Sequence, residues 1–291
     1  MSSTQALTRD NLFDLKGRVA LVTGGGSGIG LMATQALAAN GAKVYITGRT
    51  KEKLDKVVSE HFQGNEQQVI PLQADVTSKE SIQSLVKEVE SREKCLCVLV
   101  NNAGISGGRT LNADAKSAQD LKSTMFNDSS FETWTDVYRT NVAAVYFTTA
   151  AFLPLLQASS ERHQGWSGTV INISSISGLV KAAQKHFDYN ASKAAAIHLT
   201  RMLSSEIASA GLKIRVNGIA PGVFPSEMTA GESDDTQKSK LPKEDFEGKV
   251  AAARPGKDED MAQAILFATC NQYLNGDTVI VDGGYTIAAG M

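Results

Sequence analysis

The sequence predicts a single-domain α/β fold: a doubly wound parallel sheet of the Rossmann type, with helices on both faces. Three observations predict it. Segments with strand patterns alternate with segments of helical periodicity along the 291-residue chain. A glycine cluster at residues 24–30 directly follows the first apolar run. Polar residues follow the later strands, at the edge where such sheets bind ligands. No linker, internal repeat or low-complexity segment divides the chain, so we expect one domain over residues 1–291.

The individual elements follow from apolar runs and the residues that end them. Residues 19–22 form a short β-branched run typical of a buried strand. Apolar residues at helical spacing then continue from Leu31 until Asn40-Gly41 ends the helix. The same patterns predict further strands over residues 43–47, 69–72, 97–100, 169–173, 213–219 and 278–281, and further helices over residues 51–61, 79–90, 131–156, 189–210 and 258–270. Right-handed crossovers would place these helices on both faces of the sheet. Three polar stretches remain: a leader (1–14), an insert (105–130) and an excursion (223–256).

Composition excludes some classes of function. The net charge of −2 gives no basic surface for nucleic acid or an anionic membrane. No uninterrupted apolar run has membrane-spanning length, and the polar N-terminus lacks the apolar stretch of a signal peptide. We therefore expect a cytoplasmic protein without nucleic-acid or membrane partners.

Cysteine and histidine usage gives no reason to expect a metal. Three cysteines are too few for a disulfide framework, and Cys95 and Cys97 begin an apolar run, so we interpret both as core residues. The four histidines show no ligand spacing.

The glycine cluster resembles a phosphate-binding turn. Gly24 and Gly28 permit a tight turn, and Gly30 lets the following helix pack close to the strand. Strand, turn and helix together offer backbone N–H groups and a helix N-terminus to a pyrophosphate. The spacing is Gly-x-x-x-Gly-x-Gly rather than Gly-x-Gly-x-x-Gly, and a plain flexible turn is the alternative.

Tyr189 and Lys193 are candidates for acid–base chemistry. They are four residues apart on a predicted helix, so they share a face, with about 6 Å between their β-carbons. A neighbouring ammonium favours the phenolate and lowers the tyrosine pKa, which would let Tyr189 exchange a proton with a carbonyl or alcohol oxygen. An ordinary surface pair is the alternative.

Ser175 follows the strand 169–173 at the same edge of the sheet as the glycine turn, where its hydroxyl could orient a substrate oxygen toward Tyr189. A nucleophilic serine would need the flanking glycines of Gly-x-Ser-x-Gly, which are missing here. A polar residue that caps a loop is the remaining alternative.

Taken together, these segments resemble the short-chain dehydrogenase/reductase family over about residues 15–285. The matching residues, in chain order, are Thr23-Gly24-x-x-x-Gly28-x-Gly30, Asn101-Asn102-Ala103-Gly104, Asn141, Ser175, Tyr189-x-x-x-Lys193, Pro221-Gly222 and Asp282-Gly283-Gly284. The resemblance implies a nicotinamide dinucleotide cofactor, a small-molecule substrate and a homotetramer or homodimer.

The resemblance also assigns roles to residues. Tyr189 matches the general acid/base, Lys193 the residue that tunes it, Ser175 the substrate-orienting serine and Asn141 the asparagine of the proton relay. Ser175 is preferred to Ser174 because Gly178 completes the pattern Ser-x-x-Gly. Residues 223–256 match a substrate lid. The implied cofactor-binding residues are Gly24, Ser27, Gly28, Ile29, Gly30, Arg49, Asp75, Asn102, Tyr189, Lys193, Val223 and Ser226.

Arg49 decides which cofactor we expect. The second strand ends in Thr47-Gly48-Arg49 and carries no acid that would bind the ribose diol of NAD, whereas an arginine can bind a 2′-phosphate. We therefore predict NADP(H) and the reduction of a ketone, either a 3-oxoacyl thioester or a polyketide carbonyl. The alternatives are an alcohol dehydrogenase that runs oxidatively, and a non-redox member of the family that acts as a cyclase, an isomerase or a binding protein.

Overall fold

A computed structural model describes residues 4–65, 67–108 and 115–291. It contains a seven-stranded sheet in the order β3-β2-β1-β4-β5-β6-β7, in which every neighbouring pair is parallel. The strands are β1 (Val19–Thr23), β2 (Lys43–Gly48), β3 (Val69–Gln73), β4 (Val98–Asn101), β5 (Gly168–Ile173), β6 (Ile214–Pro221) and β7 (Thr278–Val281). The predicted doubly wound sheet is confirmed.

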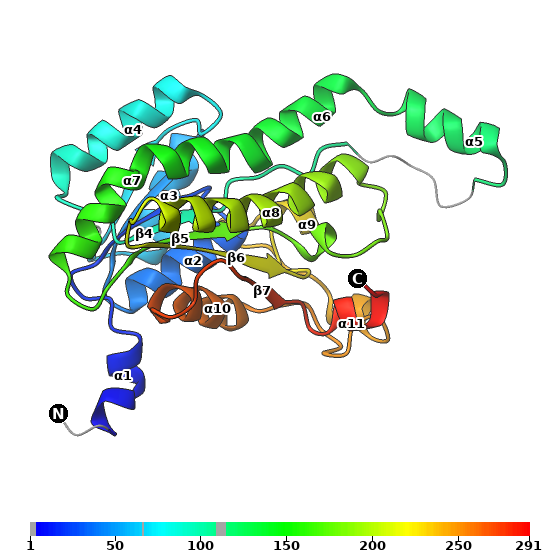
Figure 1. Ribbon diagram of the computed structural model, residues 1–291. Helices are drawn as coiled ribbons and strands as arrows, with labels where there is room; N and C mark the ends of the chain where they lie inside the picture. The colour runs from blue at the N-terminus through cyan, green and yellow to red at the C-terminus, as the bar shows by residue number, and fades with distance from the viewer. Residues whose placement is uncertain (1–3, 66, 109–114) are drawn as a thin grey trace.

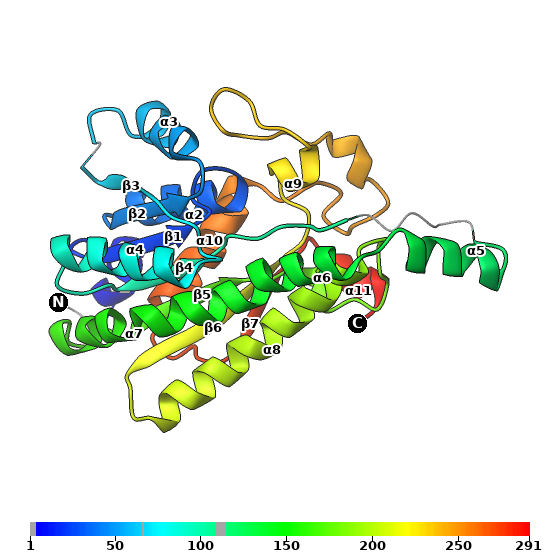
Figure 2. The ribbon, with the colours of Figure 1, turned by 90° about the horizontal axis from the view of Figure 1, so that it is seen from above.

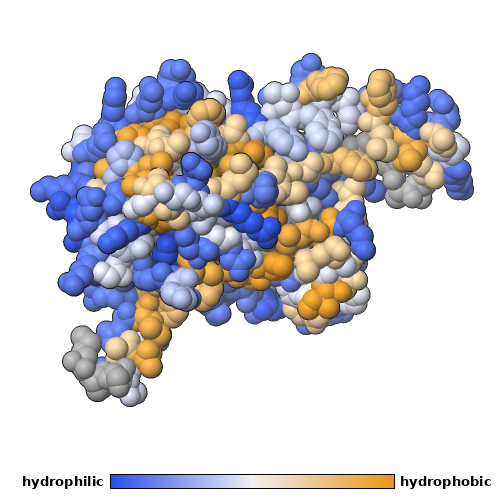
Figure 3. Space-filling view, viewed as in Figure 1, coloured by the Kyte–Doolittle hydropathy of each residue, from blue (hydrophilic) through white to orange (hydrophobic). Residues whose placement is uncertain are grey.

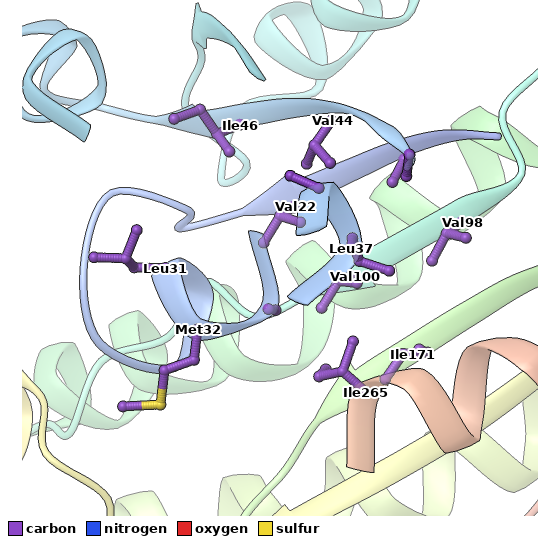
Figure 4. Packing of buried hydrophobic residues seen from close by; sticks show 14 of the residues in the cluster. Val22, Leu31, Met32, Leu37, Val44, Ile46, Val98, Val100, Ile171 and Ile265 are labelled. Carbon is purple, nitrogen blue, oxygen red and sulfur yellow. The ribbon is translucent and has the colours of Figure 1, made fainter. Parts of the chain in front are cut away.

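Helices cover both faces of this sheet (Figures 1 and 2). One layer consists of α2 (Gly28–Ala39), α3 (Lys51–His61) and α10 (Asp258–Cys270), and the other of α4 (Lys79–Arg92), α7 (Ala144–Arg162) and α8 (Phe187–Ser209). Strand side chains alternate between the layers, as the pleat requires. Ala20 and Val22 pack with α2, and Leu21 packs with α7. Figure 4 shows the first of these cores, between β1, β2, β4 and α2.

The segments between these helices differ most from the prediction. The helix predicted over 131–156 consists of α6 (Phe131–Tyr138), a π-helical turn (Arg139–Ala143) and α7, which continues to Arg162. The polar insert contains α5 (Ala118–Lys122) and a second π-helical turn (Ser123–Asn127). Figures 1 and 2 both show α5 projecting away from the sheet. Residues 109–114 of the insert lie outside the described residues.

The remaining elements are short. The polar leader contains a 3₁₀ turn (Gln5–Leu7) and α1 (Arg9–Leu12), whose residues are all exposed. The segment 223–256 contains α9 (Glu227–Ala230) and a 3₁₀ turn (Lys243–Phe246), and α11 (Tyr285–Ala289) follows β7. A further 3₁₀ turn (Ile176–Gly178) follows β5.

One helical stretch, residues 131–162, is long and apolar enough to span a membrane by length and composition. Within it, Phe152 and Leu156 are completely buried against the sheet, and 44% of its most apolar window is buried. We interpret the stretch as a core helix with one apolar side facing outward.

The strand order sets the position of the site. From β1 the chain continues to β2 and β3 on one side of the sheet, and then crosses to β4 on the other side of β1. The loops after β1 and β4 therefore diverge, which opens a crevice at the carboxyl edge where α/β sheets bind ligands.

Candidate active site

A cleft of about 490 Å³ occupies this edge of the sheet. It extends from Arg49, after β2, to Tyr189 and Lys193 on α8. Of the residues predicted to bind a cofactor, those that line it are Gly24, Ser27, Gly28, Ile29, Arg49, Asp75, Asn102, Tyr189, Lys193 and Ser226. The fold thus brings together residues that the chain separates widely.

The glycine turn forms one wall of the cleft. Gly24 and Gly28 adopt positive φ angles of +65° and +52°, as a tight turn requires. A β-carbon on Gly30 would overlap the carbonyl oxygen of Gly24, so the predicted close packing of strand and helix is present. This close-packed turn at the start of α2 fits the pyrophosphate of a dinucleotide.

Asn102 braces this turn. Its Nδ2 donates hydrogen bonds of 3.0 Å to the carbonyl oxygens of Thr23 and Gly24. The Thr23 hydroxyl accepts the backbone N–H of Asn102 at 3.0 Å and that of Ala103 at 3.1 Å. Asn102 therefore lines the cleft and also fixes the end of β4 against the end of β1.

Arg49 and Asp75 form the far end of the cleft. Arg49 is exposed at the tip of β2. Burial alone would raise the pKa of Asp75, but hydrogen bonds from the backbone and hydroxyl of Thr77 (2.9 and 2.7 Å), together with the charges of Arg49 and Arg139, hold it below its ordinary value. Asp75 is therefore ionised at neutral pH beside two guanidinium groups.

Lys193 is buried at the other end of the cleft, with 5% of its surface exposed. Its Nζ lies 5.5 Å from the centre of the Tyr189 ring and donates a 3.0 Å hydrogen bond to the carbonyl oxygen of Ile173. Burial lowers the pKa of Lys193 to about 8. The Tyr189–Lys193 pair is thus inside the site and is not a solvated surface pair.

The expected lowering of the Tyr189 pKa is outweighed by burial in this structure. Burial raises the pKa of the phenol, and a hydrogen bond with Ser175 offsets only part of this effect. The Lys193 ammonium donates its hydrogen bond to the carbonyl oxygen of Ile173 and lies 5.5 Å from the centre of the phenol ring. Tyr189 is therefore protonated at neutral pH and can act as a proton donor.

The two adjacent serines after β5 have different partners. The Ser174 hydroxyl donates to the carbonyl oxygen of Ile219 on β6 at 2.9 Å, which fixes it in the sheet. The Ser175 hydroxyl accepts the backbone N–H of Ser177 at 3.1 Å and is hydrogen-bonded to Tyr189. A β-carbon on Gly178 would lie 2.5 Å from the backbone of Lys193, so this glycine lets the turn approach α8. These contacts favour Ser175 over Ser174 as the serine next to Tyr189.

Asn141 lies behind the cleft, in the π-helical turn Arg139–Ala143. Its Oδ1 accepts the N–H of Ile105 at 2.9 Å, and its Nδ2 donates to the carbonyl oxygen of Ile105 at 2.9 Å and to the hydroxyl of Ser192 at 3.0 Å. The side chain thus joins the segment after β4 to α8, one residue before Lys193. π-Helical turns often occur at functional sites.

Four predicted residues lie outside the lining of the cleft: Gly30, Val223, Asn141 and Ser175, whose neighbour Ser174 lines it instead. Gly30 is behind the turn, and Val223 lines a neighbouring cavity of about 120 Å³ with Phe224 and Arg254. Sequence reasoning missed Arg139 and Glu227, which do line the cleft. Glu227 accepts hydrogen bonds from Lys53 (2.6 Å), Ser233 (2.7 Å) and Ser27 (3.5 Å). No sequence signal links Glu227 to Lys53, because 174 positions separate them.

Comparisons with known proteins agree with this geometry. Residues 18–237 match the family model described as short chain dehydrogenase. The short-chain dehydrogenase/reductase PhomF of Diaporthe leptostromiformis is 39% identical over 297 residues, which covers 97% of this chain and 96% of PhomF. The rhamnolipids biosynthesis 3-oxoacyl-[acyl-carrier-protein] reductase of Pseudomonas aeruginosa is 34% identical over 275 residues, covering 94% of this chain and 98% of that protein.

Solved structures show the same similarity. The RhlG/NADP active-site complex of Pseudomonas aeruginosa superposes with a TM-score of 0.77 at 33% identity, covering 94% of this chain and 98% of that chain. A 7α-hydroxysteroid dehydrogenase complexed with NADH and 7-oxo glycochenodeoxycholic acid also gives 0.77, at 25% identity, covering 96% and 97%. With the fold, the glycine turn and the Tyr189–Lys193 pair in place, these matches show that the chain belongs to the short-chain dehydrogenase/reductase family.

Proposed function

We propose that this oxidoreductase uses NADPH to reduce a ketone to an alcohol, with Tyr189 as the general acid. One observation carries the proposal. One end of the cleft holds a protonated tyrosine, which interacts with Ser175, and a buried lysine. The other end holds the exposed Arg49, and the tip of its own strand carries no acidic residue. The first end suits proton transfer to a carbonyl oxygen, and the second suits a phosphate.

The residues of the chain would act as follows. Ser175 and Tyr189 donate hydrogen bonds to the carbonyl oxygen of the substrate and hold it at the Tyr189 end of the cleft. As this oxygen gains negative charge, Tyr189 gives it the phenolic proton. The ammonium of Lys193 stabilises the phenolate that remains. Asn141 positions α8 through Ser192 and Ile105. The dinucleotide, when bound along the glycine turn, supplies the hydride.

The preference for NADP(H) rests on Arg49. Arg49 is exposed at the tip of β2, and Ser27 lines the same cleft. The NADP complex of the similar Pseudomonas structure supports this preference, whereas the similar hydroxysteroid dehydrogenase was solved with NADH. Oxidation of an alcohol with NAD is therefore the second candidate, and the absence of redox activity is the third.

We further propose that the substrate is a small ketone, either a 3-oxoacyl thioester or a polyketide carbonyl. The names of the Pseudomonas, Thermotoga and Staphylococcus relatives, which are 3-oxoacyl-[acyl-carrier-protein] reductases, support the first class. We also propose that the protein is a cytoplasmic homodimer or homotetramer and that residues 223–256 form its substrate lid.

Titration of the purified protein with NADPH and NADH, followed by fluorescence, tests the cofactor. We expect tighter binding of NADPH, weakened in Arg49→Ala by about ten- to a hundredfold, as for a lost charge-assisted phosphate contact of about 1.5–3 kcal/mol. Lys51→Ala is the matched control, because Lys51 is a nearby exposed cation that pairs with Asp55. Equal binding of both cofactors would favour alcohol oxidation, and binding of neither would favour a non-redox protein.

The role of Tyr189 is tested separately with Tyr189→Phe. This variant should bind NADPH like the native chain, while the turnover of a 3-oxoacyl thioester or a polycyclic ketone falls by about 10² or more as the general acid is lost. Undiminished turnover would refute the assigned role.

A further inference from the structure

A group of thiol and imidazole ligands lies at the amino edge of the sheet, opposite the cleft. The Sγ atoms of Cys95 and Cys97 and a ring nitrogen of His163 all lie within 4.8 Å of one another. The Sγ of Cys95 is 3.8 Å from Nε2 of His163. Cys95 and Cys97 are buried, with 6% and 0% of their surface exposed, whereas His163 is partly exposed. Within residues 4–65, 67–108 and 115–291, this is the one group of three such ligands.

The backbone holds both sides of the group in place. Leu96 donates its N–H to the carbonyl oxygen of Leu155 on α7 (3.0 Å), and Cys97 donates to Val19 on β1 (2.8 Å). Alternate residues of an extended segment point to the same side, which places both cysteines in the core next to α2 and Leu96 in the opposite core. His163 ends α7, and its N–H donates to Ser159 at 3.0 Å. Backbone hydrogen bonds therefore fix the positions of the segments that carry the three ligands.

The spacing suits a small tetrahedral ion. Zinc–sulfur bonds of about 2.3 Å and zinc–nitrogen bonds of about 2.0 Å imply ligand–ligand separations of roughly 3.5 Å in a tetrahedron. The observed 3.8 Å between Cys95 and His163 is close to this value. The other separations, at most 4.8 Å, would need to contract by about 1 Å.

We propose that Cys95, Cys97 and His163 bind one Zn²⁺ ion, with a water molecule as the fourth ligand on the exposed side of His163. Thiolate and imidazole ligands are typical of zinc sites. As the two sulfur–zinc bonds form, both thiols release their protons to solvent, and the resulting thiolates balance the charge of the ion. The site would fasten the start of β4 to the end of α7 and take no part in hydride transfer.

Arg18, a cation close to the group, has another partner. The guanidinium of Arg18 packs over the ring of Trp166 at 4.5 Å, and so is engaged by an aromatic face beside the group. A neutral imidazole with two thiolates gives a donor set whose charge matches that of Zn²⁺.

The experiment uses the full chain without a histidine tag. The protein is first reduced and treated with a chelator, and it is then titrated with Cd²⁺ or Co²⁺ as a spectroscopic probe. We expect a thiolate-to-metal charge-transfer band that saturates at one equivalent. Cys270→Ser is the matched control, because it removes the third cysteine, which lies outside the group, and should leave the band unchanged. Cys97→Ser should abolish it.

His163→Gln keeps the proposal testable if the buried serine variants do not fold, because His163 is partly exposed. It should bind the probe at least about tenfold more weakly, and Zn²⁺ should raise the Tm of the native chain and of Cys270→Ser more than that of His163→Gln. Absence of the band in the native chain, or an unchanged affinity in His163→Gln, would overturn the proposal.

Discussion

The buried ammonium of Lys193 is costly for the fold. Its side chain sits at the base of the cleft, where the hydrogen bond that the structure describes goes to a neutral carbonyl group. Burial therefore disfavours the charged form and lowers the pKa from 10.5 to about 8. The cation next to Tyr189 therefore lowers the free energy of unfolding.

This cost gives a pH dependence with a defined sign. Because the pKa of Lys193 is lower in the folded chain, the unfolded chain binds more protons between pH 8 and 10.5, and stability rises with pH in that window. Below pH 8 the full penalty is present. Relative to Lys193→Met, the free energy of unfolding of the cofactor-free native chain should gain about 2–3 kcal/mol between pH 7 and 10.5. Urea unfolding at several pH values measures this gain, and parallel profiles for the two proteins would contradict it.

The sequence predicted well those elements whose formation depends on residues close to one another in the sequence. The strand–glycine turn–helix unit of β1 and α2 could be predicted because Gly30 must accommodate a carbonyl group, whatever the rest of the chain does. The seven strands were found for the same reason, since each is a short apolar run ended by polar or glycine residues.

Elements that depend on distant partners could not be predicted in this way. The π-helical turn that divides α6 from α7 contains Asn141, whose amide is paired with Ile105 from another part of the chain. In the loop before α8, Gln184 and Lys185 adopt φ angles of +52° and +68° without any glycine to indicate a turn. The side chain of Gln184 accepts a hydrogen bond from Ser177 and donates one to Tyr285, near the end of the chain.

The predicted lid (residues 223–256) contacts α3 through ion pairs between residues that lie far apart in the sequence. Glu227 accepts hydrogen bonds from Lys53 at 2.6 Å and from Ser233 at 2.7 Å, and Asp235 pairs with Lys56 at 3.1 Å. The hydrogen bond from Lys53 is the largest of the effects that lower the pKa of Glu227. Partly exposed ion pairs of this type contribute about 0.2–1 kcal/mol, enough to alter the opening of one segment without unfolding the domain.

We therefore expect Glu227→Gln to loosen the lid. Limited trypsin digestion after Lys238, Lys240 and Lys243 should proceed up to about fivefold faster than in the native chain, while the midpoint of global unfolding changes little. Asp235→Asn is the matched control, because solvent screens the ion pair between its fully exposed carboxylate and Lys56, so cleavage should change less than in Glu227→Gln. Equal cleavage rates in Glu227→Gln and the native chain would mean that Lys53 does not hold the lid.

At the scale of the whole molecule, none of the described residues covers the outer side of the stretch 131–162 completely. Together with Leu199 of α8, its residues line a shallow apolar hollow of about 670 Å³: Trp134, Tyr138, Val142, Tyr146 and Phe147. Tyr146 remains 47% exposed and Phe147 37% exposed. Figure 3 shows apolar residues interspersed with polar ones over this side of the molecule and along the arm that carries α5. An exposed apolar side of this kind suits either lipid or a second copy of the chain.

We expect a second copy to cover it, because Lys79 lies 5.1 Å from the Phe147 ring, and a charged side chain is accepted at the polar rim of a protein interface but is costly in a lipid core. Analytical ultracentrifugation should find a dimer or tetramer, which a Tyr146→Glu, Phe147→Glu double variant reduces to smaller species. Losing two buried aromatic rings and adding two like charges should weaken the interface by several kcal/mol. Leu12→Glu, on the exposed α1, is the control and should leave the assembly intact. A monomeric native chain that sediments with lipid vesicles would instead assign the apolar side of residues 131–162 to a membrane surface.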